Sequence, residues 1–173
     1  PTRSVKTNSA ICKSDWPTDD MPRGYHIVAI GPKHDPDLHK AIANYEKRLT
    51  PYGGVTWRLL GYSQATGVQA RQLESTSLLS CLESNDYVIL LDERGSQLTS
   101  EGLAETLGRS QASQRVVCVI GGAYGVDARL HQRADLILSL SSLVFPHQLA
   151  RLLLIEQLYR SEMIRLGHPY HHQ

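Results

Sequence analysis

Two short runs of the chain are apolar through their centres, and they restrict the fold more than any other feature. They are DYVILLD at 86–92 and RVVCVIGG at 115–122. A strand that lacks alternating polar residues is covered on both faces, as strands of a parallel sheet are. Parallel strands need a long crossover connection, which is usually a helix. The two runs therefore predict a sheet with helices packed on both sides.

The rest of the chain alternates in the same way. Further strands are expected at 25–31, 55–62 and 135–142, where short runs are rich in β-formers. Helical spacing of apolar residues predicts helices at 36–53, 70–84, 99–111, 127–134 and 146–166. Strands that alternate with helices indicate an α/β fold with a mainly parallel sheet.

Length and charge limit the function. The 173 residues suffice for one domain with a core, which is expected at 24–173. Residues 1–23 are polar and unpatterned, so they are interpreted as a flexible N-terminal extension. No run approaches the ~20 apolar residues of a membrane helix. A net charge of +1 argues against binding that depends on neutralising many phosphates, but it permits RNA to be read by a local pocket.

The cysteines and histidines suggest neither a disulfide framework nor a metal site. Cys12, Cys81 and Cys118 lie far apart without CxxC spacing, which fits a reducing cytosol. Cys118 falls inside an apolar run, where a small buried hydrophobe is expected. The C-terminal HPYHHQ has no Asp, Glu or Cys close by to complete a metal site.

Three strand ends carry residues suited to a ligand site. Ligands of open α/β sheets bind beyond the carboxyl ends of the strands. The three ends are LDERG at 91–95, GGAYG at 121–125 and SLSSLVFP at 139–146. The glycine turn is neither GxGxxG nor a P-loop, which disfavours a dinucleotide-dependent oxidoreductase. Taken alone, that turn leaves a structural and a ligand-binding role open, and Glu93 and Arg94 are interpreted as a solvated turn.

The last predicted helix begins with an unusual pair. His147 and Arg151 are four residues apart and share one face of the helix. Cationic side chains at a helix start oppose the helix dipole. The pair is therefore either part of a solvated face or a functional pair placed there despite the dipole.

Four segments resemble one known family. LDERG, VIGGAYG, LSLSSLVFPHQLARLLLIEQLYR and the terminal HPYH look like the bacterial ribosomal RNA large-subunit methyltransferase H family, in matching order over 25–171. These are SPOUT-class methyltransferases that methylate N3 of a pseudouridine in 23S rRNA, on assembled ribosomes. The resemblance implies a C-terminal deep trefoil knot, a homodimer, S-adenosylmethionine as methyl donor and a cytoplasmic location.

The resemblance also implies site residues. The donor is expected to contact Leu91, Gly121, Gly122, Ser141, Ser142, Leu143, Val144, Phe145 and Pro146. Four catalytic residues are expected near the target base: His147, Arg151, Tyr170 and His171, the last two from the tail of the same or the partner subunit. As hypotheses, Arg151 steadies phosphate or developing negative charge, Tyr170 stacks or hydrogen-bonds, and a histidine takes the proton.

Two other functions remain open at this stage. One is a SPOUT methyltransferase that acts on another rRNA nucleotide or on tRNA. The other is a non-catalytic ribosome-associated protein that keeps the fold without turnover. Binding of S-adenosylmethionine would separate the second from an enzyme, because an inactive scaffold need not bind the donor.

Overall fold

The computed structural model describes residues 24–170, so the extension predicted at 1–23, Cys12 and the tail residue His171 lie outside the described residues. The strands are β1 (Tyr25–Ile30), β2 (Val55–Leu60), β3 (Tyr87–Gln97), β4 (Val116–Ile120) and β5 (Leu136–Ser139). The helices are α1 (Pro36–Leu49), α2 (Gly67–Leu79), α3 (Ser100–Gln111), α4 (Ala128–Arg133) and α5 (His147–Arg165), with a 3-10 turn at Thr50–Tyr52. Strands and helices alternate, as predicted.

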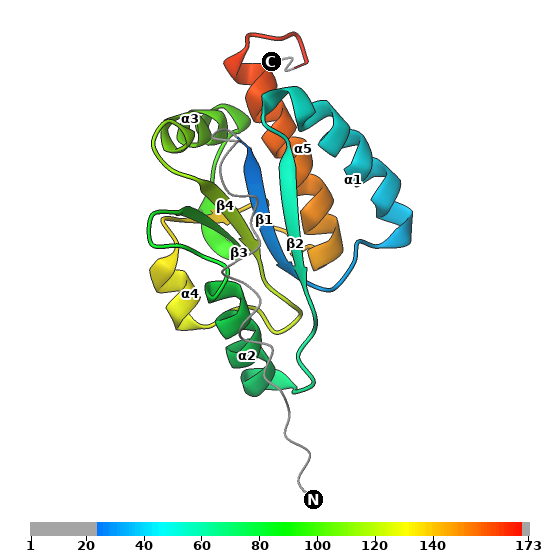
Figure 1. The fold of residues 1–173 in the computed structure, drawn as a ribbon, viewed down its shortest axis with the longest axis vertical. Coiled ribbons are helices and arrows are strands. Elements are labelled where there is room, and N and C mark those ends of the chain that lie inside the picture. Colours follow the sequence, from blue (N-terminus) through cyan, green and yellow to red (C-terminus); the bar gives the residue numbers. More distant parts are fainter. Residues whose placement is uncertain (1–23, 171–173) are drawn as a thin grey trace, which may run out of the picture.

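Within the described part of the chain, the five strands form one sheet in the order β2-β1-β4-β3-β5, and every pairing is parallel (Figure 1). This confirms the predicted α/β class. The pairing of β3 with β5 is irregular, because Leu91 and Ser96 both pair with Leu138. Residues 92–95 therefore bulge out of the sheet. The trefoil knot implied by the resemblance stays a prediction.

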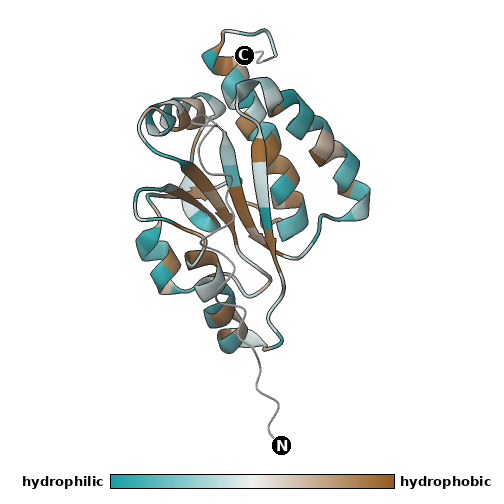
Figure 2. Cartoon of the chain, viewed as in Figure 1, coloured by the Kyte–Doolittle hydropathy of each residue, from teal (hydrophilic) through white to brown (hydrophobic). Residues whose placement is uncertain are grey.

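Helices cover both faces of the sheet, as the two apolar runs required. Side chains of α1, α3 and α5 pack with Ile27 and Ala29 of β1 on one face. Leu78 of α2 and Leu130 of α4 pack with Val28 and Ile30 on the other. Hydrophobic residues concentrate on the strands, whereas the outer sides of α1 and α3 are largely hydrophilic (Figure 2).

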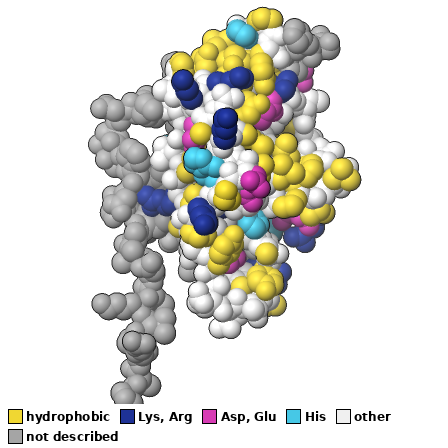
Figure 3. Space-filling model, turned by 90° about the vertical axis from the view of Figure 1, so that its right-hand side faces the viewer, with side chains coloured by type: hydrophobic (Ala, Val, Ile, Leu, Met, Phe, Trp, Pro, Cys, Tyr) yellow, Lys and Arg dark blue, Asp and Glu magenta, His cyan; other side chains and the backbone are white. Residues whose placement is uncertain are grey.

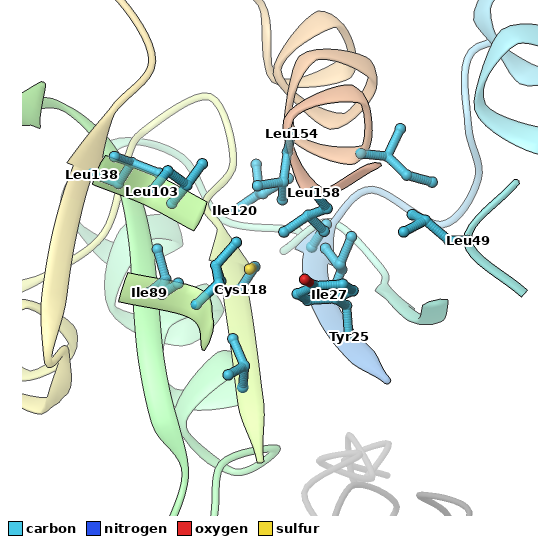
Figure 4. Close-up of a cluster of buried hydrophobic side chains, with 14 of the residues drawn as sticks. Tyr25, Ile27, Leu49, Ile89, Leu103, Cys118, Ile120, Leu138, Leu154 and Leu158 are labelled. Atoms are coloured by element: carbon cyan, nitrogen blue, oxygen red, sulfur yellow. The ribbon is translucent and has the colours of Figure 1, made fainter. Parts of the chain in front are cut away.

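The α5 side of the core is the larger of the two. Leu154 and Leu158 of α5 point from the helix toward Ile120 of β4 and Ile27 of β1 (Figure 4). Cys118 lies in the same cluster as a free and fully buried thiol, which confirms its prediction as a small core hydrophobe. This packing fixes α5 against the centre of the sheet.

The cysteine spacing argued against a disulfide framework, but Cys81 is disulfide-bonded. Sequence spacing is a poor guide here, because the fold decides which cysteines lie within bonding distance.

Local sequence explains most helix boundaries. Asp35 caps α1 by accepting a hydrogen bond from the backbone N–H of Asp37 at 2.9 Å, and Pro36 follows at the first position, where no N–H is needed. Thr99 caps α3 in the same way, by accepting a hydrogen bond from the backbone N–H of Gly102. The main departures are that α2 begins three residues earlier than predicted and that β3 runs on to Gln97.

Candidate active site

The three strand ends singled out by sequence do meet in space. They surround a cavity of about 140 Å³ beyond the carboxyl ends of β3, β4 and β5. Its walls are Leu91, Asp92, Glu93, Ile120, Gly121, Gly122, Gly125, Val126, Leu138, Leu140, Ser141, Leu143, Phe145, His147 and Ala150. Of the nine residues predicted to contact the donor, Ser142, Val144 and Pro146 are not part of these walls. The other six are.

The glycine turn after β4 forms one wall. The N–H of Gly125 donates to the carbonyl oxygen of Gly122 at 3.0 Å, and Gly125 has a φ of 69°, which favours glycine. A Cβ on Gly121 would lie 2.9 Å from Val126, and a Cβ on Gly122 would lie 2.5 Å from a carboxylate oxygen of Glu74. The turn therefore needs glycine for close packing, and it presents bare backbone to the cavity.

The β3 bulge forms a second, acidic wall through Asp92 and Glu93. Asp92 accepts hydrogen bonds from the backbone and side chain of Arg94 and makes a 2.9 Å contact with His131 Nε2. Partial burial would raise the pKa of Asp92, but these hydrogen bonds outweigh it and lower the pKa to about 2. Asp92 is therefore ionised and already paired. Arg94 and Glu93 are both exposed, as interpreted from sequence, and Glu93 also lines the cavity.

The loop between β5 and α5 forms the third wall. Ser139 Oγ donates to the carbonyl oxygen of Ser141, and Ser141 Oγ accepts from the N–H of Leu143. These two bonds hold the loop in a tight turn at the cavity. Leu143 and Val144 are 68% and 74% exposed, so the loop also carries apolar side chains on the surface.

His147 lies at the cavity, and its predicted catalytic role stays a prediction. It begins α5, it lines the cavity, and its Nε2 lies 3.3 Å from the hydroxyl oxygen of Tyr62, the second residue after β2. Burial and the nearby Arg151 guanidinium lower the pKa of His147, while the Glu74 carboxylate partly opposes them. The imidazole is therefore mainly neutral at pH 7 and able to accept a proton.

Arg151 occupies a different environment from the one expected. Its side chain is fully buried, and its two terminal nitrogens donate to the carbonyl oxygens of Ile30, Gly31 and Lys33 at 2.8 to 3.0 Å. Gly31 leaves room for this approach, because a Cβ there would lie 2.8 Å from the guanidinium. In the described chain Arg151 thus ties the loop after β1 to the first turns of α5. Its predicted contact with phosphate stays a prediction.

Tyr170 lies at the other end of α5. Its ring packs edge-on against Tyr159 at 5.0 Å, and its hydroxyl donates to Glu156 at 3.3 Å. Tyr159 comes twelve positions after His147, which corresponds to about 18 Å along a helix. Figure 1 shows the C-terminal end of the described chain at the opposite end of the sheet from the carboxyl ends of β1 and β2. One chain therefore does not bring Tyr170 to the cavity.

Two residues near the cavity were not singled out from sequence. Tyr62 could have been found, because it directly follows the carboxyl end of β2 and its neighbour Gly61. Glu74 gave no signal, since it lies in the middle of α2 and its burial depends on packing against Gly122. Within residues 24–170, no group of His, Cys, Asp and Glu could hold a metal ion, and no helix is long and apolar enough to cross a membrane.

Comparison with known proteins identifies the family of this chain. The family model described as "Predicted SPOUT methyltransferase" matches residues 24–171. A relative from Synechococcus sp., named ribosomal RNA large subunit methyltransferase H, is 41% identical and covers 87% of this chain and 96% of its own length. A relative of the same name from Gloeobacter violaceus is 37% identical over 84% of this chain and 97% of its own.

A solved structure shares the fold. The structure of a protein from Haemophilus influenzae, described as a "probable methylase family protein", covers 88% of this chain and 72% of its own, with a TM-score of 0.54 and 13% identity. At that identity the likeness concerns the fold alone. The family match over nearly the whole described chain, together with relatives near 40% identity, shows that this chain belongs to the SPOUT methyltransferase family.

Proposed function

We propose that this protein transfers a methyl group from S-adenosylmethionine to N3 of a pseudouridine in 23S rRNA, with the assembled ribosome as its substrate. The observation that carries the proposal is the cavity beyond the strand ends, with a glycine wall on one side and His147 on another. Relatives named as ribosomal RNA large subunit methyltransferases support the choice of an rRNA substrate. The proposal includes a cytoplasmic location, because the substrate is the ribosome.

The chemistry of the cavity fits a cationic donor. S-adenosylmethionine supplies an electrophilic methyl group bound to a positively charged sulfur. Asp92 and Glu93 line the cavity, and none of its described wall residues is Lys or Arg. Leu91, Ile120 and Leu138 offer apolar contacts for a base, and the Gly121–Gly122 backbone allows close approach. These residues would hold the donor.

His147 is the proposed proton acceptor. Methylation at N3 requires the loss of the N3 proton, and a neutral imidazole at the cavity can accept it. The contact with Tyr62 orients the ring, since its Nε2 faces the hydroxyl. Arg151 supports this arrangement as a positioning residue, because it holds the loop after β1 against the turn of α5 that follows His147.

A homodimer is part of the proposal. The exposed Leu143 and Val144 beside the cavity suit burial against a second copy. Tyr170 is remote from His147 within one chain, so the tail of the partner subunit is the better candidate to contact the target base.

The charge distribution fits recognition of a structured particle. Figure 3 shows a face on which basic, acidic and histidine side chains are mixed with hydrophobic ones, without a continuous basic patch. Binding to isolated rRNA fragments is therefore expected to be weak at physiological salt.

The test is methyl incorporation into ribosomes from cells that lack the modification. Purified protein and labelled S-adenosylmethionine are expected to label 23S rRNA in assembled ribosomes, with N3-methylpseudouridine as the product found by mass spectrometry. Deproteinised rRNA should be labelled far less. His147→Ala should lower the rate by about a hundredfold, whereas the exposed control His39→Ala should not. Labelling of another nucleotide or of tRNA would overturn the substrate assignment.

A further inference from the structure

Glu74 is a buried carboxylate with one oxygen unpaired. Its side chain projects from α2, and the residue is 5% exposed. One oxygen accepts a hydrogen bond from the backbone N–H of Ser63 at 3.1 Å. The other oxygen, Oε2, finds no hydrogen-bond partner among residues 24–170. A buried carboxylate normally has each oxygen hydrogen-bonded or its charge paired, so the free oxygen of Glu74 requires an explanation.

The unpaired oxygen lies directly behind the cavity wall. A Cβ on Gly122 would lie 2.5 Å from Glu74 Oε2, and Gly122 lines the cavity. This oxygen therefore packs against Gly122, a residue of the cavity wall. The charge of Glu74 also acts on the cavity. Burial and Arg151 lower the pKa of the wall residue His147, and the Glu74 carboxylate opposes them by raising it.

Asp92, a second carboxylate at the same cavity, has a charged partner in Arg94, and Glu74 has none among the described residues. Asp92 makes hydrogen bonds with Arg94 and His131, so much of its charge is compensated within the protein. Glu74 accepts a hydrogen bond from the backbone N–H of Ser63, and this donor is uncharged. The field of Glu74 is therefore available to a cation in the cavity, where the low local dielectric strengthens it.

We propose that Glu74 is a positioning residue that makes the cavity prefer the cationic methyl donor over its neutral thioether product. The inference rests on the proposed function. The donor carries a fixed positive charge on sulfur, and the product, S-adenosylhomocysteine, does not. A buried negative charge behind Gly122 attracts the cationic sulfur of S-adenosylmethionine, but it does not attract the neutral sulfur of S-adenosylhomocysteine. The preference favours release of the product after each methyl transfer.

The test compares the two affinities by isothermal titration. Glu74→Gln keeps the shape of the side chain and an acceptor for the N–H of Ser63, but it removes the charge. It is expected to weaken S-adenosylmethionine binding by about tenfold and to leave S-adenosylhomocysteine binding within about twofold. The control Glu105→Gln changes an exposed residue of α3 that pairs with Arg109, and it should alter neither affinity.

The outcomes separate the inference from the proposed function. A purely structural role of Glu74 would weaken both ligands equally, and that result would overturn the inference. Equal affinity of the unmodified protein for both ligands would also overturn it, without any variant. Failure of the unmodified protein to bind either ligand would instead overturn the proposed donor.

Discussion

Residues that the sequence assigned to one site lie at the two ends of α5, and their surroundings differ. At the first end, His147 lines a cavity and Arg151 is buried among backbone carbonyl oxygens. At the far end, Tyr170 packs on Tyr159 beside the ion pair of Arg160 with Glu156. About 18 Å of helix separates His147 from Tyr159. Sequence motifs typical of one site therefore need not meet within one chain.

Mixing two inactive variants tests whether the two ends of α5 act in one site. A chain cut after Gly167 lacks Tyr170 and His171, and His147→Ala lacks the proton acceptor. Each alone is expected to lose about a hundredfold in the rate of methyl transfer. If the site combines both ends from two subunits, a mixed dimer has one complete site. Coexpressed variants should then recover roughly a quarter of normal activity. The absence of any recovery would show that the tail does not act across a dimer.

The next largest effect concerns stability at the first end of α5. Arg151→Ala leaves the carbonyl oxygens of Ile30 and Gly31 buried without their donor, so the free energy of unfolding should fall by about 3 kcal/mol. Arg160→Ala removes a partly exposed ion pair with Glu156 and should cost less than about 1 kcal/mol. Urea denaturation measures both. A stable Arg151→Ala protein that has lost activity would favour the contact with phosphate that the resemblance implied.

The two ends of α5 should also differ in how they respond to pH. The pKa of His147 is lowered by burial and by Arg151, so the neutral, proton-accepting form persists below pH 6.5. The rate of methyl transfer should fall only at more acidic pH, by about tenfold for each unit below that pKa. At the far end, burial raises the pKa of Tyr170, so its phenol stays protonated at neutral pH. His147→Asn should abolish the acidic decline, and an unchanged profile would assign the proton to another group.

The order of elements was predictable because it depends on local periodicity. Each strand of the sheet and each helix appears near its expected range, and Asp35 and Thr99 cap helices through side chains of their own segments. The bulge after Leu91 was not predictable, since it depends on how β3 pairs with β5. Register between strands far apart in sequence is set by packing, which local patterns do not contain.

The candidate site was predictable in part for the same reason. The rule that ligands bind beyond strand ends found the LDERG, GGAYG and SLSSLVFP segments, and it would have found Tyr62. The rule could not find Glu74, because this residue reaches the site only by packing against Gly122, which lies 48 positions later in the sequence. It also could not separate His147 from Arg151, which share one helix face but differ in burial.

Sequence alone was enough to predict the α/β class, the parallel sheet and the segments that line the cavity. These features depend on local patterns, because a buried strand, a helix or a turn is specified by a few neighbouring residues. Only the tertiary structure decided that Arg151 holds the loop after β1, that Tyr170 lies remote from the cavity and that Glu74 stands behind Gly122. These facts depend on contacts between residues tens of positions apart, which exist only once the core has packed around α5.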